Sequence, residues 1–491
     1  MEDNGIKVFS VDDFLRYQAR MGLGLNLVKL RDKSTADMQL SRQYIMRWLK
    51  MPITNERNLR EASRKAYRTN QQYKELIQYK ASLPMWRYIL EPYSVNYSTA
   101  QKSIRNMRRD FYEYGAFIEK MNLPHELEIV LRTTFIDGIC YGVCVEGQDS
   151  FTIYAMNPDL CRLAMLEDGT FLFEVDVARI PADVIGAYPD VIQRLWRRYY
   201  EDRENQPRWQ LVPGDACFCL KADESLHSYS LPPYISTLPL VADLDNYTEL
   251  AAAQAELSMY KMIAMTIPLD TNKKPTMNYE DAMKYYNQVA ANLPDEVGAI
   301  ATPFSYTIVG FDESSTTTKV DRISDAVNRF WAGSCVNSLI FGDATNKSAT
   351  ALKISVMKDE QMIYSCIKQA GRIINRILKY KFPARGTKTR YRLTFLPVTW
   401  MNVEDKAKQY REAATYGMPT KMAFAATLGI EPEKFEGMNI LEENVFDMFG
   451  TLKPLRASTT LSADDVGRPS TEETGELPSD KTGQNRETGG D

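Results

Sequence analysis

Two amphipathic helical segments, separated by a short insertion, restrict the possible folds of this chain more than any other feature of its sequence. Residues 239–263 form the first predicted helix, and a second begins near Thr317 and ends at Val336. Between them, residues 264–315 contain a strand, a helix and a further strand. Two helices of similar length joined in this way predict an antiparallel hairpin that holds the insertion away from the rest of the molecule.

In a monomer, the sides of this hairpin would expose apolar stripes over tens of ångströms, since a helix of roughly 25 residues is about 37 Å long. The stripe on the first helix is formed by Leu244, Tyr247, Leu250, Gln254, Leu257 and Lys261. Copies packed side by side around an axis would bury such stripes, so the pattern predicts a ring with head-to-tail interfaces. Glu249 and Glu256 share one helix face, where they could line a channel or pair with Lys261 and Arg322 of neighbouring copies.

A long third helix is predicted from Ser348, its N-cap, to about Lys381, a span on the order of 50 Å. Its apolar stripe consists of Val356, Ile363, Ile367, Ala370, Ile374 and Ile377. The loop 337–347 connects this helix to the hairpin, and Gly342 with Asp343 permits a tight turn there. The other polar residues of interest in the loop are Asn337, Thr345, Asn346 and Lys347. A plain turn and a surface for weak contacts with phosphate both fit this composition.

The first half of the chain predicts an α+β fold. Helices are expected over 55–79, 98–121, 124–138 and 181–200. Four short strands are expected between residues 139 and 177, the last two joined by an Asp168-Gly169 hairpin, and two more around Trp209 and Cys217. Strand 391–400 is expected to complete the same sheet. The stretch RNMRRDFYEYG mixes arginines with aromatics, which fits either a nucleic-acid surface or an ordinary amphipathic helix.

The C-terminal part of the sequence has two sections of different character. Short helices are predicted over 403–456, with breaks at Gly417 and Gly429. Residues 457–491 are acidic and almost free of large apolar side chains, so this tail is predicted to be disordered in the free protein.

Composition restricts the chemistry further. The net charge of -4 argues against tight binding of nucleic acid, because neutralisation of phosphates by Lys and Arg supplies most of that affinity. The same net charge is compatible with DNA that slides past the protein without being bound tightly. Seven irregularly spaced cysteines predict buried apolar residues in place of disulfides, and with only His125 and His227 a four-ligand zinc site is not expected. The absence of a long apolar run and of a secretory signal predicts a cytosol-like compartment and no membrane.

Motifs of common enzymes are missing from the sequence. It contains no GxxxxGK[ST] loop for nucleotide phosphates, no GxSxG nucleophile elbow and no HExxH zinc helix. Asp243 and Asp245 resemble a paired-carboxylate metal site, but acids near a helix N-terminus are also favoured by the helix dipole. The chain is therefore predicted to be no enzyme and to need no metal or cofactor.

The order of these elements resembles the portal proteins of tailed bacteriophages, in particular those of phages of Gram-positive hosts. Five phrases add to the resemblance: RNMRRDFYEYGAF, MNPDLCRLAMLEDGTFLFEVDV, LPPYISTLPLVADLDNY, SLIFGDATNKSATALKIS and DVGRPSTEETGELPSDKTG. The resemblance covers about residues 40–455 and implies the following parts: a wing (1–238), a stem helix (239–263), a clip (264–315), a returning stem helix (316–336), a tunnel loop (337–347), a long wing helix with a strand (348–402), a crown (403–456) and an acidic tail (457–491).

The resemblance implies a late structural protein of the virion that forms a ring, usually of twelve subunits, at one capsid vertex after assembly in the host cytoplasm. Double-stranded DNA would pass through its channel during packaging and ejection, and the tunnel loop would touch that DNA. The large terminase subunit would dock on the clip and a head-tail adaptor would later replace it, and major capsid and scaffold proteins would be further partners. Candidate clip docking residues are Tyr279, Lys284, Tyr285 and Tyr286.

Two other interpretations remain open from the residues alone. The chain could be another virion structural protein, such as a head-tail adaptor or a minor capsid protein, although these are usually shorter. It could also be a nuclease that uses scattered carboxylates. A large ring with a central hole would favour the portal interpretation over both.

Overall fold

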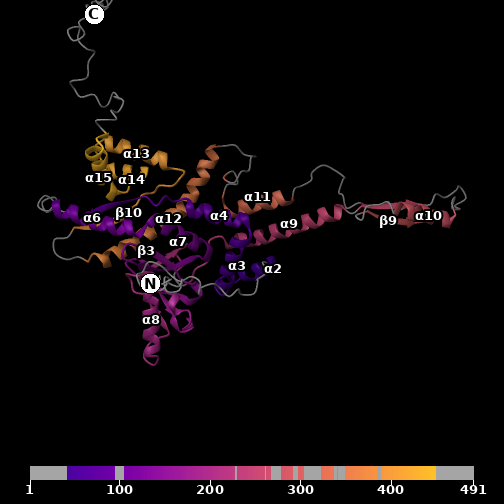
Figure 1. The fold of residues 1–491 in the computed structure, drawn as a ribbon, viewed down its shortest axis with the longest axis horizontal. Coiled ribbons are helices and arrows are strands. Elements are labelled where there is room, and N and C mark those ends of the chain that lie inside the picture. Colours follow the sequence, from indigo (N-terminus) through magenta and orange to yellow (C-terminus); the bar gives the residue numbers. More distant parts are fainter. Residues whose placement is uncertain are drawn as a thin grey trace, which may run out of the picture. The chain divides into compact units, whose positions relative to one another are not determined.

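The computed structural model describes residues 41–93, 104–226, 229–259, 261–266, 278–290, 297–302, 322–336, 340, 349–383 and 389–448 (Figure 1). Contacts between residues divide the chain into two units, Met1–Pro432 and Glu433–Asp491. The first unit combines helices with small antiparallel and parallel sheets, which confirms the α+β class.

The described part of residues 41–138 is mainly helical. It contains α2 (Arg42–Leu49), α3 (Glu56–Thr69), α4 (Gln71–Ser82), α6 (Ile104–Met121) and α7 (Leu123–Asp137). The single helix predicted over 55–79 is wrong, because Asn70 adopts an extended backbone that ends α3, and its side chain accepts the N–H of Tyr73 to cap α4. The predicted end of α7 at Gly138 is confirmed, with a φ of +83°.

Residues 139–221 form two antiparallel sheets, with the strand orders β3-β2-β7 and β4-β5-β6. The strands are β2 (Ile139–Glu146), β3 (Phe151–Ala155), β4 (Cys161–Glu167), β5 (Thr170–Asp176), β6 (Trp209–Leu211) and β7 (Cys217–Lys221). The hairpin predicted at Asp168-Gly169 is confirmed, and both residues have the positive φ that a type I′ turn requires.

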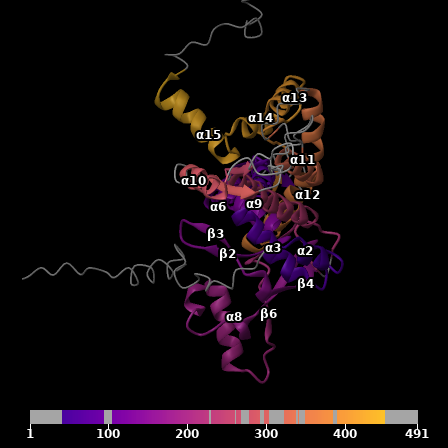
Figure 2. The same cartoon turned by 90° about the vertical axis from the view of Figure 1, so that its right-hand side faces the viewer.

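The helix predicted from Pro181 is shorter than expected. The segment begins with 3₁₀ turns, η3 (Val177–Arg179) and η4 (Ile185–Ala187), and only then forms α8 (Asp190–Glu201). Pro189 explains the delay, since a residue before proline is disfavoured in the helical conformation, and Tyr188 is indeed extended. α8 contacts η3, and Figure 2 shows it in the lower part of the view.

The strand near residue 391 does not complete the earlier sheet, which corrects the prediction. β10 (Arg390–Phe395) instead pairs with β1 (Tyr88–Tyr93) in a separate antiparallel ribbon. Helix α12 (Ala349–Lys381) packs beside this ribbon, and the side-chain amide of Asn375 both donates to the Leu393 carbonyl and accepts its N–H, each at 2.8 Å. The amide thus pairs with β10 as a neighbouring strand would.

Helix α12 confirms the long helix predicted from Ser348 to Lys381, although Ser348 itself lies outside the described residues. The predicted stripe is buried throughout: Val356, Ile363, Ile367, Ala370, Ile374 and Ile377. Two buried polar side chains connect the helix to the antiparallel sheets. Gln369 bonds both backbone groups of Lys221 on β7, and Arg376 donates to the Thr170 hydroxyl and the Cys217 carbonyl.

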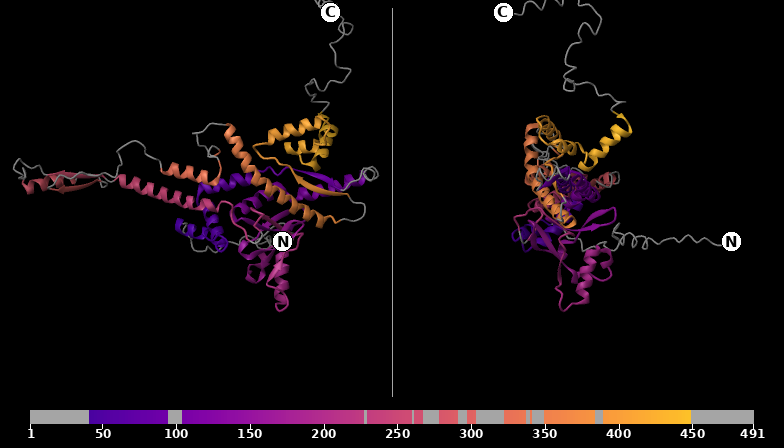
Figure 3. Two further views of the ribbon diagram at one scale, coloured as in Figure 1. Left: turned by 180° about the vertical axis from the view of Figure 1, so that it is seen from behind. Right: turned by 90° about the vertical axis from the view of Figure 1, so that its left-hand side faces the viewer.

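The predicted hairpin is present with shifted boundaries. α9 (Leu238–Met259) ends earlier than residue 263, and β8 (Lys261–Thr266), α10 (Tyr279–Ala290) and β9 (Val297–Thr302) follow before α11 (Arg322–Ser334). β8 and β9 are parallel neighbours joined through α10. The strand predicted at MTIPLD therefore begins four residues early, and Lys261 belongs to it and not to the helix. Figures 1 and 3 show α10 and β9 beyond the far end of α9.

The C-terminal helices are α13 (Val403–Thr415), α14 (Lys421–Leu428) and α15 (Pro432–Ile440), the last followed by a π-helical turn (Leu441–Val445). Breaks at Gly417 and Gly429 are confirmed, and both glycines have positive φ. α14 packs on β1, where Ala423 and Ala426 form a small core with Leu396 and Val398.

Buried cysteines lie mainly in the core of the antiparallel sheets. Six are buried (Cys140, Cys144, Cys161, Cys217, Cys219 and Cys366), and all seven are free. Burial raises the pKa of Cys140 to about 12 and that of Cys217 to about 11. These six are therefore inert thiols that pack as apolar groups, as the sequence predicted, while Cys335 is exposed.

Candidate functional site

The base of the hairpin is built into the main core. Leu238, Val241 and Ala242 in the first turns of α9 are buried together with Phe330 and Trp331 of α11. Gly333 lets the two helices approach, because a Cβ added there would lie 2.7 Å from Cδ1 of Leu240. The two helices therefore leave the core as a contacting pair.

Two carboxylates fix the orientation of α9. Asp243 pairs with Arg42 of α2 at 2.7 Å, and Asp245 accepts a hydrogen bond of 3.1 Å from the side chain of Asn70, the residue between α3 and α4. These contacts give the two acids a structural role that neither the metal-site nor the dipole interpretation anticipated. Among the described residues, no group of three or more His, Cys, Asp and Glu side chains is placed to hold a metal ion.

Leu244, the first member of the predicted stripe, is also buried, at 3% exposure, so the chain's own core covers it. From Asn246 on, the described side chains of α9 are exposed, except that of Tyr247, which is half-buried. Glu249, a predicted interface residue, is exposed, and Leu250 next to it is 64% exposed. A single exposed leucine is common on a protein surface. The exposure of Leu250 is informative because this residue belongs to the apolar stripe predicted from the sequence. The predicted interface residues Glu256 and Leu257 lie in α9, Arg322 opens α11 and Lys261 lies in β8, but their side chains are outside the described part.

The β8-α10-β9 unit presents a polar helix surface. Lys284 is exposed and pairs with Asp281 one turn earlier at 3.2 Å, while Tyr285 is 55% exposed. Tyr279 and Tyr286 also lie in α10, with side chains outside the described part. Of the four predicted docking residues, Lys284 and Tyr285 are thus exposed, and their role in docking stays a prediction.

The loop predicted to contact DNA lies between two anchored helix ends. Its candidate residues Asn337, Asp343, Thr345, Asn346 and Lys347 are outside the described residues. On one side, α11 ends with Trp331 and Val336 buried and with Cys335 at a φ of +58°. On the other side, Val356 and Asp359 of α12 are buried.

A buried ion pair stabilises this junction. Nζ of Lys80 on α4 lies 2.5 Å from Oδ1 of Asp359, and both side chains are only 4% exposed. The hydroxyl of Tyr79 donates to the other carboxylate oxygen at 3.2 Å. Burial lowers the pKa of Lys80, and the carboxylate of Asp359 opposes that shift. The pair was not predicted from the sequence, although Lys80 and Asp359 each occupy a position of an apolar stripe, next to Ile77 and Val356.

Helix α6 separates the arginines and most of the aromatics of the stretch RNMRRDFYEYG onto different faces. Arg105, Arg108 and Arg109 are exposed, whereas Tyr114 and Phe117 point into the core. Tyr114 stacks on Phe382 with ring centroids 4.2 Å apart, so its ring is not available for a base. The arginine and aromatic pattern is that of an amphipathic helix.

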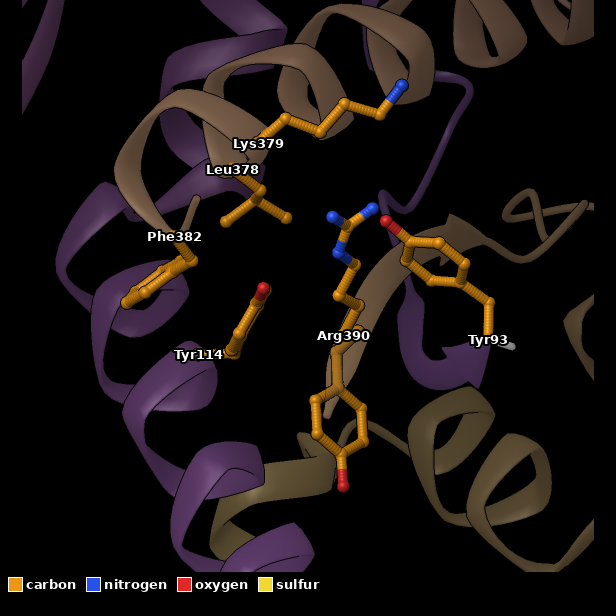
Figure 4. Close-up of a pocket in the computed structure, with 7 residues that line it drawn as sticks. Tyr93, Tyr114, Leu378, Lys379, Phe382 and Arg390 are labelled. Atoms are coloured by element: carbon orange, nitrogen blue, oxygen red, sulfur yellow. The ribbon is translucent and has the colours of Figure 1, made fainter. Parts of the chain in front are cut away.

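A small pocket of about 260 Å³ lies where α6, α12, β1 and β10 meet (Figure 4). It is lined by Tyr93, Tyr114, Leu378, Lys379, Phe382, Arg390 and Tyr391. Its two cations and three phenols give it a polar rim, and Tyr391 is fixed by a hydrogen bond of 2.8 Å to the Met107 carbonyl. Burial raises the pKa of Tyr391 to about 12, so this phenol is neutral.

Comparisons with known proteins give a limited result. No protein-family model matches the sequence, and no curated protein matches it. Among solved structures, similar chains occur in the virion of a native gene transfer agent particle, in the neck of the empty particle computed with C6 symmetry and in the neck of the native particle computed with C12 symmetry. Each is 10% identical and covers 77% of this chain and 94% of its own, with TM-scores of 0.38, 0.38 and 0.37. Scores this low do not establish a common fold.

No helix in the described residues combines the length and the apolar character needed to cross a bilayer.

Proposed function

We propose that this chain is a portal protein, a virion structural subunit that assembles into a ring and conducts DNA through its centre. The observation that supports the proposal most directly is the helical hairpin. α9 begins in the core and continues into solvent, with the apolar Leu250 exposed, and α11 contacts it and ends in the core. A protein gains nothing from such a surface as a monomer, whereas neighbouring copies around an axis would bury it.

Exposed apolar side chains near the C-terminal end of the first unit support assembly as well. Around α13 and α14, the exposed residues include Trp400, Met401, Tyr416, Met418 and Leu428. Exposed apolar side chains of this size contribute to protein interfaces. A portal ring offers several: between copies, with the capsid and scaffold proteins, and with the head-tail adaptor.

The mechanism we infer is mechanical and electrostatic, and it involves no covalent chemistry by this chain. In a ring of twelve copies the segment 337–347 would face the channel, and each copy would offer short polar groups with nearly balanced charge. Such a lining exchanges its contacts with phosphates quickly, so DNA can move in either direction. The buried pair of Lys80 and Asp359 would hold one end of this segment in a fixed position.

The β8-α10-β9 unit, at the far end of the hairpin, is the proposed docking site for the terminase large subunit during packaging and for the adaptor afterwards. Lys284 and Tyr285 are the described residues placed to contact either partner. Tyrosine supplies a large contact area at little cost in conformational entropy, which suits a surface used by successive partners.

The test is the mass and shape of the purified protein. Twelve copies of a 56.2 kDa chain weigh about 670 kDa, which native mass spectrometry separates easily from a monomer, and negative-stain images should show a ring with a central hole. Replacing Leu250 by aspartate should give a folded monomer, because the side chain is already exposed in the single chain.

A suitable control is Leu166→Asp, which places the same charge on a leucine that is 52% exposed on β4, outside the hairpin. This variant should still form rings. A wild-type protein that stays monomeric at high concentration would exclude the portal interpretation and favour an adaptor, whereas degradation of DNA in the presence of a divalent metal would favour a nuclease.

A further inference from the structure

The solvent-facing side of α12 is uniformly polar and basic between residues 358 and 372. The exposed side chains there are Lys358, Gln361, Ser365, Lys368 and Arg372. All five can donate a hydrogen bond, and none is acidic or apolar. They recur at intervals of three and four residues, so they lie along one face of the helix. Figure 3 shows α12, in orange, running along one side of the first unit. We call these five residues the basic stripe.

The acids of α12 do not neutralise the basic stripe, because they are buried. Asp359 is paired with Lys80, and Glu360 accepts hydrogen bonds from Thr399 at 2.5 Å and Asn402 at 3.1 Å. Between residues 358 and 372 the helix therefore separates its charges, with its acids on the core side and its bases outside. This separation is absent from α13, where Glu404 and Glu412 are exposed together with Lys408.

The three cations of the stripe have no ion pair or hydrogen bond with any residue that the structure describes. The lysines at the C-terminal end of α12 differ in this respect, since Lys379 pairs with Asp168 at 2.5 Å and Lys381 with Glu146 at 2.7 Å. Three unpaired like charges on one face bring no stability to the folded chain by themselves. Their arrangement points instead to an anionic partner.

The spacing of the stripe fits a phosphate backbone. At 1.5 Å per residue, Lys358 and Arg372 are separated by about 21 Å along the helix axis. Duplex DNA repeats a phosphate on each strand every 3.4 Å of its axis, so the stripe spans about six base pairs. Lys and Arg with Ser and Gln are also the side chains that commonly bind phosphate oxygens.

We propose that the basic stripe of α12 is a contact surface for the backbone of double-stranded DNA, independent of base sequence. An acidic protein surface fits less well, because the centre of a protein interface is normally depleted in lysine and the five residues of the stripe are all polar, although the neighbouring Met357 is 58% exposed. This surface is separate from the segment 337–347. The inference does not require a ring, so it can fail while the portal proposal stands, and the reverse also holds.

The test compares the full chain with the variant Lys358→Gln, Lys368→Gln, Arg372→Gln. Glutamine has nearly the helix propensity of lysine and arginine, so α12 should remain intact. Binding to a fluorescein-labelled duplex of about 30 base pairs is followed by anisotropy between about 50 and 200 mM salt. Each phosphate contact contributes about 0.9 to the slope of log K against log salt concentration, so the variant should lose about 2.7 from that slope.

The matched control is Arg194→Gln, Arg197→Gln, Arg198→Gln on α8, which removes the same charge from three other exposed residues. It should bind DNA with the wild-type slope. No binding by the wild-type protein at about 50 mM salt, an unchanged slope in the α12 variant, or equal losses in both variants would overturn the proposal.

Two further measurements on the same samples exclude other partners. If the α12 variant fails to form the assembly seen for the wild-type protein, the stripe is a contact between copies and the DNA proposal is wrong. If polyglutamate displaces the duplex as effectively as unlabelled DNA at equal charge, the stripe recognises acidic protein, and the proposal fails as well. Displacement by DNA alone, with an unchanged assembly, supports it.

Discussion

Replacing Lys80 by methionine should lower the free energy of unfolding by about 3–5 kcal/mol, the usual cost of removing one partner from a buried ion pair. Both side chains are 4% exposed, and Nζ lies 2.5 Å from the carboxylate. Methionine is flexible, apolar and of similar helix propensity, so it keeps most of the packing and removes the charge. The loss would therefore arise from Asp359, which would be left buried without its cation.

The double variant Lys80→Met, Asp359→Leu should recover most of this loss. A buried pair replaced by apolar residues is often neutral in stability, because the desolvation of both charges is avoided. A remaining cost of about 1–3 kcal/mol is expected, since the hydroxyl of Tyr79 donates to Asp359 and would lose its acceptor. The free energy of unfolding should therefore decrease from the wild type to the double variant and again to the single variant.

Urea unfolding followed by circular dichroism measures this order, with Lys74→Met as the control. Lys74 lies on the same helix, is half buried and makes no side-chain bond to a described residue, so its replacement should change stability by less than about 0.5 kcal/mol. A Lys80→Met variant within about 1 kcal/mol of the wild type, or a double variant no more stable than the single one, would refute the idea of a desolvated pair at this junction.

Three further predictions concern other contacts. Asn375→Ala should cost about 2 kcal/mol by thermal denaturation, because both backbone groups of Leu393 lose their partner; Asn375→Gln should not restore it. In the native protein a thiol reagent should modify Cys335 alone, and all seven cysteines in denaturant, since burial raises the pKa of the other six. Burial raises the pKa of Glu146, but the hydrogen bonds and charges of Lys381 and Lys120 outweigh burial and lower that pKa below 4.5. These ion pairs should therefore stabilise the protein above pH 4.5 and lose their effect as the pH falls further. In Glu146→Gln the loss of stability on acidification should be less steep.

The long helices and the turns between strands were predictable because their signals are local. The stripe from Val356 to Ile377 repeats with the helical period over the whole of α12, and every member is buried. The Asp168-Gly169 turn and the glycine at the end of α7 specify backbone conformations that few other residues adopt. The hairpin of α9 and α11 was predicted in the same way, although its boundaries were not.

The errors concern contacts between distant parts of the sequence. β1 and β10 are separated by nearly 300 residues, and neither contains a signal that identifies its partner. The break at Asn70 was missed because the sequence there has no glycine or proline, and the cap depends on the side chain of Asn70 alone. The ion pair at the junction was missed because a lysine and an aspartate within apolar stripes gain meaning only when they face each other.

The polar side chains of α12 allow this one helix to bond to several neighbouring elements at once. Asp359, Gln369, Asn375 and Arg376 each bond a different partner, on α4, β7, β10 and the β5–β7 region respectively. A shift of α12 by one residue would rotate it by about 100° and leave the three buried groups and the half-buried Asn375 without their partners, at a cost of about 1–3 kcal/mol for each buried group. Apolar contacts alone would tolerate such a shift better. These four side chains therefore fix the register of α12, and with it the set of side chains that the helix presents along the basic stripe.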